Sequence, residues 1–197
     1  MPRLIPIMLS LLCSLSPTLA APVPTHLMKP AVGYYPTIAG TKLVYDRGGH
    51  EEVRIVMKVE PKDGGHVVTT ETIEAGGMQS PFHKVLVNAK GVFILERYGD
   101  AYDPPHELLR LPYQANNKWE MAGTWGTSKH QEVRKTTKEE IIKVPAGEFK
   151  CIRVESQYTQ GGGTSTSTHW YAVGVGVVKV DYGGGSELIL KSFTPGK

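Results

Sequence analysis

Cysteine is nearly absent from this chain of 197 residues, which contains only Cys13 and Cys151. Cleavage of the N-terminal segment after Ala20 would leave Cys151 alone, and a single thiol cannot form an internal disulfide. The mature fold must therefore be held together by its core. Cys151 lies between Lys150 and Ile152 in a strand-like stretch with no helix N-terminus beside it. This setting favours a small buried hydrophobic side chain over a reactive nucleophile.

The sequence also lacks any concentration of charge of one sign. Its formal net charge is only +3, and its basic residues are scattered along the chain without forming a run. Nucleic-acid binding requires a concentrated basic patch that neutralises several phosphates at once. We therefore expect no nucleic-acid partner and a surface of mixed charge.

Motifs for catalysis and for metal or cofactor binding are missing as well. No Gly-x-Ser-x-Gly segment occurs, and the nearest one, Gly126–His130, ends in histidine. The glycine clusters lie in hairpin turns, where they do not form phosphate-binding loops at the start of a helix. The histidines show no metal-ligand spacing, although distant strands could bring two or three together; they are His26, His50, His66, His83, His106, His130 and His169. We predict no catalytic residue, no metal and no cofactor, and thus a protein that is not an enzyme.

One catalytic alternative stays open at this point. Glu148 follows a turn, Asp181 ends a strand, and His169 precedes two aromatic residues. If any of these side chains lay in a cleft, it would supply acid–base chemistry to a secreted hydrolase acting on a polysaccharide or an ester. The simpler interpretation is that they are polar residues at hairpin ends.

No hydrophobic run is long enough to be a membrane-spanning helix. Residues 1–20 instead resemble a secretory signal peptide, with Arg3, an apolar stretch and a small-residue cleavage site at Ala20. Cys13 is a poor candidate for lipid attachment because leucines precede it. Residues 21–36 are rich in proline and predict an extended arm. We expect an exported protein, periplasmic or extracellular, with no transmembrane anchor after cleavage.

Short strands separated by turns fill the rest of the chain. Residues 51–60 alternate apolar and charged side chains, and Asp63-Gly64 marks a hairpin turn. About a dozen such strands over residues 37–195 predict an all-β domain with little helix. We expect one large curved antiparallel sheet, arranged as a meander, half-open barrel or sandwich. Within it, residues 99–106 are expected to form the longest irregular loop, and residues 130–143 a long, mainly polar strand.

The region from Val144 to Phe193 gives the clearest topology. A Val-Pro-Ala-Gly turn at residues 144–147 precedes a strand over residues 148–158, and a glycine turn leads into a strand over residues 164–173. Gly174 and Gly176 indicate a bulge, after which strands over residues 177–182 and 187–193 complete a meander.

Several of these segments resemble an uncharacterised family of exported bacterial proteins. The resemblance rests on Tyr35-Pro36, Leu111-Pro112, the Val-Pro-Ala-Gly-Glu-Phe turn at 144–149, and Trp170-Tyr171-Ala172 with the following Gly-Val-Gly. Members are called TapB-like and carry a domain of unknown function. The resemblance implies a twisted antiparallel sheet similar to the half-barrels of lipoprotein carriers. It implies no catalytic residues.

Aromatic residues gather on the strands and suggest where a ligand would bind. A curved sheet without a covering helix must either close on itself or hold an apolar ligand on its concave face. The ligand candidates are Trp119, Trp125, Trp170 and Tyr171. The sequence thus predicts a non-enzymatic envelope protein that binds a lipid or an apolar small molecule. An envelope protein partner, added through the edge of the sheet, is the main alternative.

Overall fold

A computed structural model describes residues 33–73 and 77–197, and within them all regular structure is β-strand. The strands follow one another at short intervals, as the turn signals in the sequence predict. Twelve strands are present: β1 (Lys42–Arg47), β2 (His50–Lys62), β3 (Gly65–Ile73), β4 (Gln79–Asn88), β5 (Gly91–Arg97), β6 (Asp100–Arg110), β7 (Lys118–Trp125), β8 (Ser128–Val144), β9 (Gly147–Gln160), β10 (Gly163–Ala172), β11 (Gly176–Asp181) and β12 (Glu187–Thr194).

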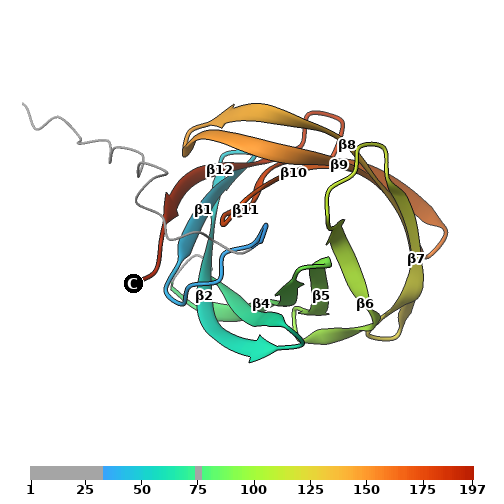
Figure 1. The fold of residues 1–197 in the computed structure, drawn as a ribbon, viewed down its shortest axis with the longest axis horizontal. Coiled ribbons are helices and arrows are strands. Elements are labelled where there is room, and N and C mark those ends of the chain that lie inside the picture. The colour runs from blue at the N-terminus through green and yellow to red at the C-terminus, as the bar shows by residue number, and fades with distance from the viewer. Residues whose placement is uncertain (1–32, 74–76) are drawn as a thin grey trace, which may run out of the picture.

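The sheet closes into a barrel (Figure 1). Each strand pairs antiparallel with its neighbour in sequence, and β1 pairs with both β2 and β12, where Lys42 lies opposite Thr194. The all-β antiparallel prediction is confirmed. Of the arrangements left open by the sequence, the meander is present, but the barrel that it forms is closed and not half-open. Closure gives every strand a partner on both sides, although β6 and β7 pair only at Tyr102–Trp125 and Asp103–Thr124.

The irregular loop predicted over residues 99–106 is wrong, because these residues belong to strand β6. Pro104 and Pro105 suggested a loop since proline cannot donate a ladder hydrogen bond. They are tolerated because β6 pairs with β7 only at Tyr102 and Asp103. On the other side, the β5–β6 ladder is irregular between Ile94 and Glu96, next to the prolines.

The two ends of the barrel differ. One end, here called the closed end, carries the β2–β3, β4–β5, β6–β7, β8–β9 and β10–β11 connections. The segment that precedes β1 packs across it: the Gly174 amide donates to the Gly33 carbonyl at 2.8 Å, and Gly40 donates to Val56 at 2.7 Å. Tyr34 and Tyr35 fill this end (the blue segment inside the ring in Figure 1). The opposite end, here called the open end, carries the other connections.

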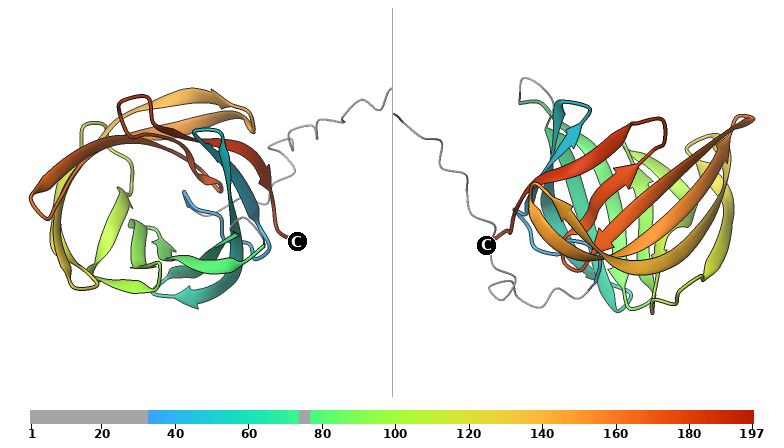
Figure 2. Two further views of the ribbon diagram at one scale, coloured as in Figure 1. Left: turned by 180° about the vertical axis from the view of Figure 1, so that it is seen from behind. Right: turned by 90° about the horizontal axis from the view of Figure 1, so that it is seen from above.

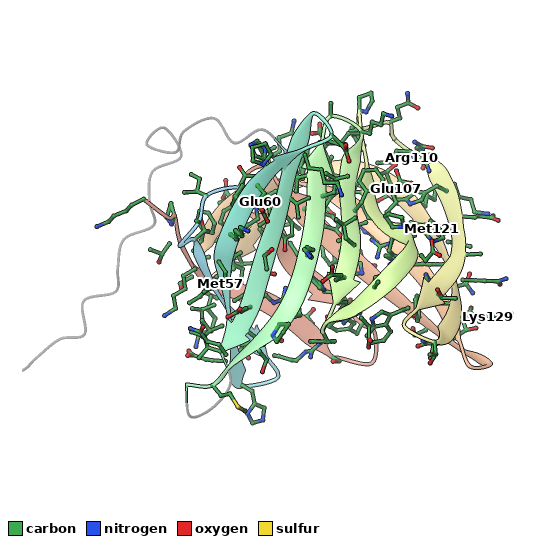
Figure 3. All side chains as sticks on the ribbon, turned by 90° about the horizontal axis from the view of Figure 1, so that it is seen from below. Met57, Glu60, Glu107, Arg110, Met121 and Lys129 are labelled. Atoms are coloured by element: carbon green, nitrogen blue, oxygen red, sulfur yellow. The ribbon has the colours of Figure 1, made fainter. Side chains whose placement is uncertain are left out.

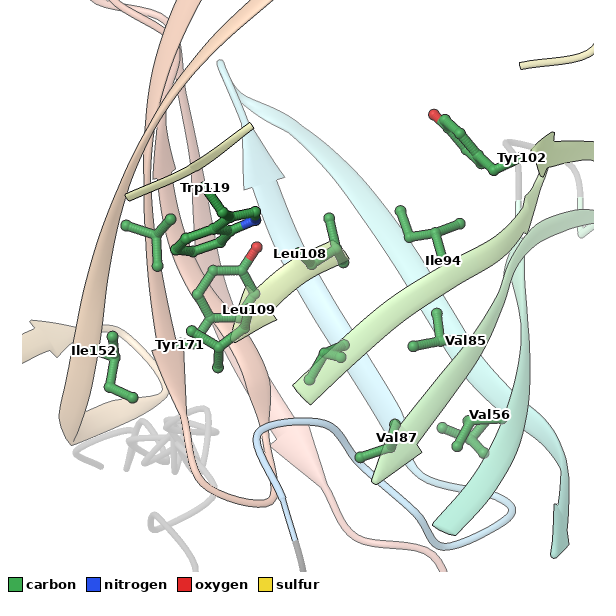
Figure 4. Close-up of a cluster of buried hydrophobic side chains, with 13 residues drawn as sticks. Val56, Val85, Val87, Ile94, Tyr102, Leu108, Leu109, Trp119, Ile152 and Tyr171 are labelled. Atoms are coloured by element: carbon green, nitrogen blue, oxygen red, sulfur yellow. The ribbon is translucent and has the colours of Figure 1, made fainter. Parts of the chain in front are cut away.

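The main hydrophobic cluster fills the closed half of the barrel and extends to Tyr102 in the open half (Figure 4). Val56 of β2, Val85 of β4 and Ile152 of β9 are fully buried and meet from different walls. A second cluster forms where the β8–β9 hairpin folds toward β12 (Figure 2), with the Ala146 amide donating to the Leu190 carbonyl at 3.2 Å. These two clusters supply the apolar burial that must stabilise a fold without a disulfide.

Cys151 belongs to the second cluster and is 1% exposed. Burial raises the pKa of its thiol to about 12, so the thiolate is strongly disfavoured. The interpretation of Cys151 as a small buried hydrophobic residue is confirmed.

The predicted signal peptide over residues 1–20, including Cys13, lies outside the described residues, as does most of the predicted arm over residues 21–36. In the ranges that the structure describes, no helix is long and apolar enough to cross a membrane.

Candidate ligand-binding site

Strand β8 turns its polar side chains into the barrel. His130, Glu132, Arg134 and Thr136 alternate with outward-facing residues and are each at most 4% exposed. Polar residues of other strands face them across the interior. We call the first three of these β8 residues, together with the polar residues that face them, the interior polar layer; it comprises Arg54, His83, Arg97, Tyr102, His106, His130, Glu132, Arg134, Ser156, Tyr158 and His169.

Glu132 is the hub of this layer. Its Oε1 lies 2.9 Å from Arg134 Nε and accepts a hydrogen bond from Ser156, and its Oε2 lies 2.6 Å from His106 Nε2. Arg134 also donates to the Leu108 carbonyl at 2.8 Å. Burial alone would raise the pKa of the Glu132 carboxyl, but the charge of Arg134 and the bond from His106 hold it well below its usual range. Glu132 is therefore a buried carboxylate whose charge is compensated by its neighbours.

The histidines of the layer are neutral. Burial lowers the pKa of His106, His130 and His169, and it lowers that of His83 well below its ordinary value, with Arg54 and Arg97 adding to that effect. Since His106 Nε2 points at a carboxylate, its proton is assigned to that nitrogen and Nδ1 becomes an acceptor. That Nδ1 atom has no partner among the described residues.

Aromatic rings line the interior toward the open end. Trp125 stacks on Tyr102 with ring centroids 6.0 Å apart and an interplanar angle of 11°. The Tyr102 ring contacts the rings of His106 at 4.9 Å and His130 at 5.4 Å. Tyr98 extends this group to the rim, where it is 51% exposed. The open half of the barrel is thus lined by rings and polar groups together.

Part of the open half of the interior is exposed to solvent. Five inward-facing side chains at this level are partly exposed, whereas Tyr102, His106 and His130 are buried. A barrel of eight strands is just filled by its own side chains, so twelve strands enclose more space than such a barrel. The half-buried members are Arg54, His83, Arg97, Tyr158 and His169.

The four aromatic residues predicted to bind a ligand do not share one surface. Trp119 and Tyr171 are buried at 3% and 1% exposure in the main cluster. Trp125 faces the open half of the interior. Trp170 points to the outer surface, where it donates to Glu140 at 2.8 Å. The expected common aromatic face is therefore wrong in its geometry, because adjacent strand positions such as 170 and 171 face opposite sides. Ligand contact at each position stays a prediction.

The alternative acid–base group is not assembled either. Glu148 is exposed at the β8–β9 hairpin on the closed end, while Asp181 lies at the opposite end and accepts from the Gly183 amide. His169 is inside the barrel, 2.9 Å from the Ser167 hydroxyl. Burial and the charge of Arg134 lower its pKa to about 3, so its imidazole is too weak a base to activate that serine near neutral pH. The arrangement does not support the hydrolase alternative.

Sequence reasoning missed the interior polar layer. The histidines looked dispersed, yet the barrel brings His106 and His130 within 5.3 Å between ring centroids. The available signal was the sequence of β8. A strand that lies between two other strands of a curved sheet turns one face inward, yet neither face of β8 is apolar. In the described ranges, no group of three His, Cys, Asp or Glu side chains is placed to hold a metal ion.

Two hollows lie on the outside of the barrel wall and not within it. One, of about 420 Å³, is lined by outward-facing Lys135, Glu155 and Thr168; the other, of about 490 Å³, by Gln131 and Thr159. Both are shallow and lined by surface side chains.

The chain was compared with protein families, with curated proteins and with solved structures. A family model described as DUF3108-like matches residues 106–188, which is less than half of the chain. A candidate lipoprotein of Parabacteroides distasonis aligns over 84% of this chain and 100% of its own, with a TM-score of 0.51 and 16% identity. At that identity the likeness shows the fold alone. Comparison with curated proteins gave no match.

Two more distant structures were also found. A candidate exported protein of Bacteroides fragilis with a YmcC-like fold aligns over 83% of this chain and 99% of its own (TM-score 0.48, 12% identity). The hypothetical lipoprotein YmcC of Escherichia coli K12 aligns over 82% and 89% (TM-score 0.42, 8% identity).

Proposed function

We propose that this chain is a non-enzymatic, exported protein of the cell envelope that binds a small amphipathic ligand in the open half of its barrel. The observation that carries the proposal is the set of partly exposed polar and aromatic side chains that face the open half of the interior, among them Trp125 and Arg97. Binding sites of this kind combine apolar and aromatic walls with a few placed polar groups. The signal-like leader and the DUF3108-like match are in keeping with export and with a domain of unknown function.

The ligand is expected to be amphipathic and not purely apolar. The closed half, where a purely apolar molecule would have to lie, is occupied by the buried side chains of the main cluster. The open half offers aromatic faces next to charged and hydrogen-bonding groups. A lipid head group with part of its chain, or a polar ring compound, matches these walls better than a hydrocarbon.

The proposal is tested by mass spectrometry of organic extracts of the full chain, expressed with its leader and purified from the envelope. We expect one compound at near-stoichiometric amount. Trp125→Ala should reduce the bound compound several-fold because it removes an interior wall, whereas Trp170→Ala should not, because Trp170 faces outward. A clean extract from folded wild-type protein, or equal losses in the two variants, would contradict interior binding.

The seam between β6 and β7 favours one second candidate, an interaction with an envelope protein. These two strands pair only at Tyr102–Trp125 and at Asp103–Thr124. Beyond these pairs, the Glu107 amide donates to Met121 Sδ at 3.1 Å, and Trp119 Nε1 donates to the Glu107 carbonyl at 3.2 Å. Figure 3 labels Glu107 and Met121. A partner strand could add here. Cross-linking from a position on the exposed part of the seam, followed by mass spectrometry, would identify such a partner.

A further inference from the structure

Three arginines project into the barrel, and two of them are neutralised by a carboxylate. Arg54 pairs with Glu52 at 2.6 Å, and Arg134 pairs with Glu132 at 2.9 Å. In the part of the chain that the structure describes, Arg97 has no such partner. It is therefore the interior cation whose charge the protein itself leaves uncompensated.

The surroundings of Arg97 hold the guanidinium in place without neutralising it. Its Cζ lies 5.2 Å from the centre of the Tyr98 ring and 5.6 Å from that of Trp125. The backbone is fixed as well, since Trp125 Nε1 donates to the Arg97 carbonyl at 3.2 Å. Side-chain hydrogen bonds with Tyr98 and Tyr102 engage part of the guanidinium, but phenol hydroxyls and ring faces carry no negative charge to compensate it. Its Nε has no partner among the described residues.

The rest of the interior layer supplies no spare negative charge. Glu132 is already engaged by Arg134, His106 and Ser156. The histidines around Arg97 are neutral, and its positive charge helps to keep His83 so. A partly buried guanidinium without a counter-ion is unfavourable, and a carboxylate or phosphate relieves this with two parallel charge-assisted hydrogen bonds.

We propose that Arg97 anchors an anionic group, a phosphate or a carboxylate, in the open half of the barrel, with the Trp125 and Tyr98 rings contacting the part of the ligand next to that group. This inference rests on the proposed function and names the chemistry of its ligand. The anion enters from the open end, where Arg97 is the last residue of β5 and Tyr98 reaches the rim.

The anion can come from a free phosphate or from a phosphorylated amphiphile, and three probes separate these sources. They are inorganic phosphate, dodecyl phosphate and the neutral dodecyl maltoside, the two amphiphiles below their micelle-forming concentrations. Binding to the mature protein is measured by calorimetry and by the rise in Tm that a ligand of the folded state produces. We expect dodecyl phosphate to bind more tightly than dodecyl maltoside. Measurable affinity for inorganic phosphate alone would indicate a free anion as the source.

Arg97→Gln should weaken dodecyl phosphate binding about 10- to 100-fold, the loss expected for a charge-assisted pair. Arg97→Lys should give a smaller loss because it keeps the charge. Arg153→Gln is the matched control, since Arg153 lies on the outer face, 5.9 Å from the centre of the Trp170 ring, and pairs with Glu155 at 3.0 Å. Its affinity should equal that of the wild type. Unliganded melting curves show whether each variant is folded.

The outcomes separate the two proposals. Equal binding of the neutral and anionic amphiphiles, unchanged in Arg97→Gln, would overturn the anion site while interior binding stands. Binding of no probe would overturn both. Equal losses in the Arg97 and Arg153 variants would show a general effect of surface charge and would also overturn the anion site.

Discussion

Glu132 shows how a single residue can determine the state of a whole interior. It is 3% exposed and stands between a guanidinium, an imidazole and a hydroxyl. Glu132→Gln keeps the shape of the side chain but leaves Arg134 as a buried cation without a counter-ion. Breaking one partner of a buried pair costs about 3–5 kcal/mol. We expect the free energy of unfolding, measured in urea at pH 7.5, to fall by roughly that amount.

Glu155→Gln provides the comparison for Glu132→Gln. Glu155 lies on the outer face of the adjacent strand β9, is 45% exposed at its side chain and pairs with Arg153. Exposed pairs contribute about 0–1 kcal/mol. If the two variants lost the same small amount of stability, the Glu132 network would not be a significant part of the fold.

At the residue scale, the sequence predicted the environment of a side chain correctly where that environment depends only on the residue's own strand. The buried, unreactive state of Cys151 follows from its position in the middle of a strand with no helix N-terminus beside it. The Glu132–His106 contact could not be predicted in that way, because it joins β8 to β6 through the curvature of the barrel. Likewise, Trp170 and Tyr171 looked like one aromatic pair until the register placed Tyr171 inward.

Among the neighbouring strands, β6 and β7 share the fewest paired residues, and at Gly123 their backbones approach each other closely. A Cβ atom at this position would lie 2.5 Å from the Asp103 carbonyl oxygen and 2.9 Å from Pro104 Cδ. Gly123→Ala would therefore push the strands apart at the one place where they pair. We expect a loss of about 1–3 kcal/mol in the free energy of unfolding, measured by urea titration.

Gly163→Ala is the control for the change at Gly123. Gly163 is also a strand glycine, but the nearest atom to its added Cβ would be the Gln160 carbonyl oxygen at 3.6 Å, an ordinary contact. This variant should be neutral or slightly stabilised, since alanine restricts the unfolded chain. If Gly123→Ala were as stable as Gly163→Ala, β6 and β7 could move apart at this position without a loss of stability. The stability of the barrel would then not depend on their close approach.

Strand β8 shows why elements are easier to predict than their environment. Its existence follows from its position between turns, and the observed Ser128–Val144 extends the prediction of residues 130–143 only slightly. The sequence pattern does not say that its polar face lies inside. An inward polar face is stable only because polar side chains of β6, β9 and β10 lie opposite it and interact with it. Those side chains are distant from β8 in the sequence or belong to other strands.

At the scale of the whole molecule, about a dozen strands were predicted and twelve are present, but the sequence did not show whether the sheet closes into a barrel. Closure depends on the pairing of β1 with β12, which places Lys42 opposite Thr194 across almost the entire described chain. No local pattern encodes such a pair. It follows from the number, length and twist of all the intervening strands, which together return the last strand to the first.

A closed barrel with neutral histidines inside should lose stability as the pH falls. For His169 the folded pKa of about 3 lies below the unfolded value of about 6.5, so between these values only the unfolded chain takes up protons. His83, His106 and His130 are shifted in the same direction, and Glu132 adds a further loss below about pH 4.5. We expect the free energy of unfolding to be at least about 2 kcal/mol lower at pH 5 than at pH 7.5.

Urea titrations at several pH values test this, and two variants assign the effect. His169 faces Arg134, Arg97, His106 and Glu132, so protonating it adds a charge to a layer that already holds several cations. His169→Gln should make the decline toward pH 5 less steep, because it removes one histidine that takes up a proton in the unfolded chain but not in the folded protein. His50→Gln, an exposed position at the start of β2, should leave the decline unchanged. A wild-type protein as stable at pH 5 as at pH 7.5 would mean that the barrel accommodates charged histidines, and that its interior is far more hydrated than its burial indicates.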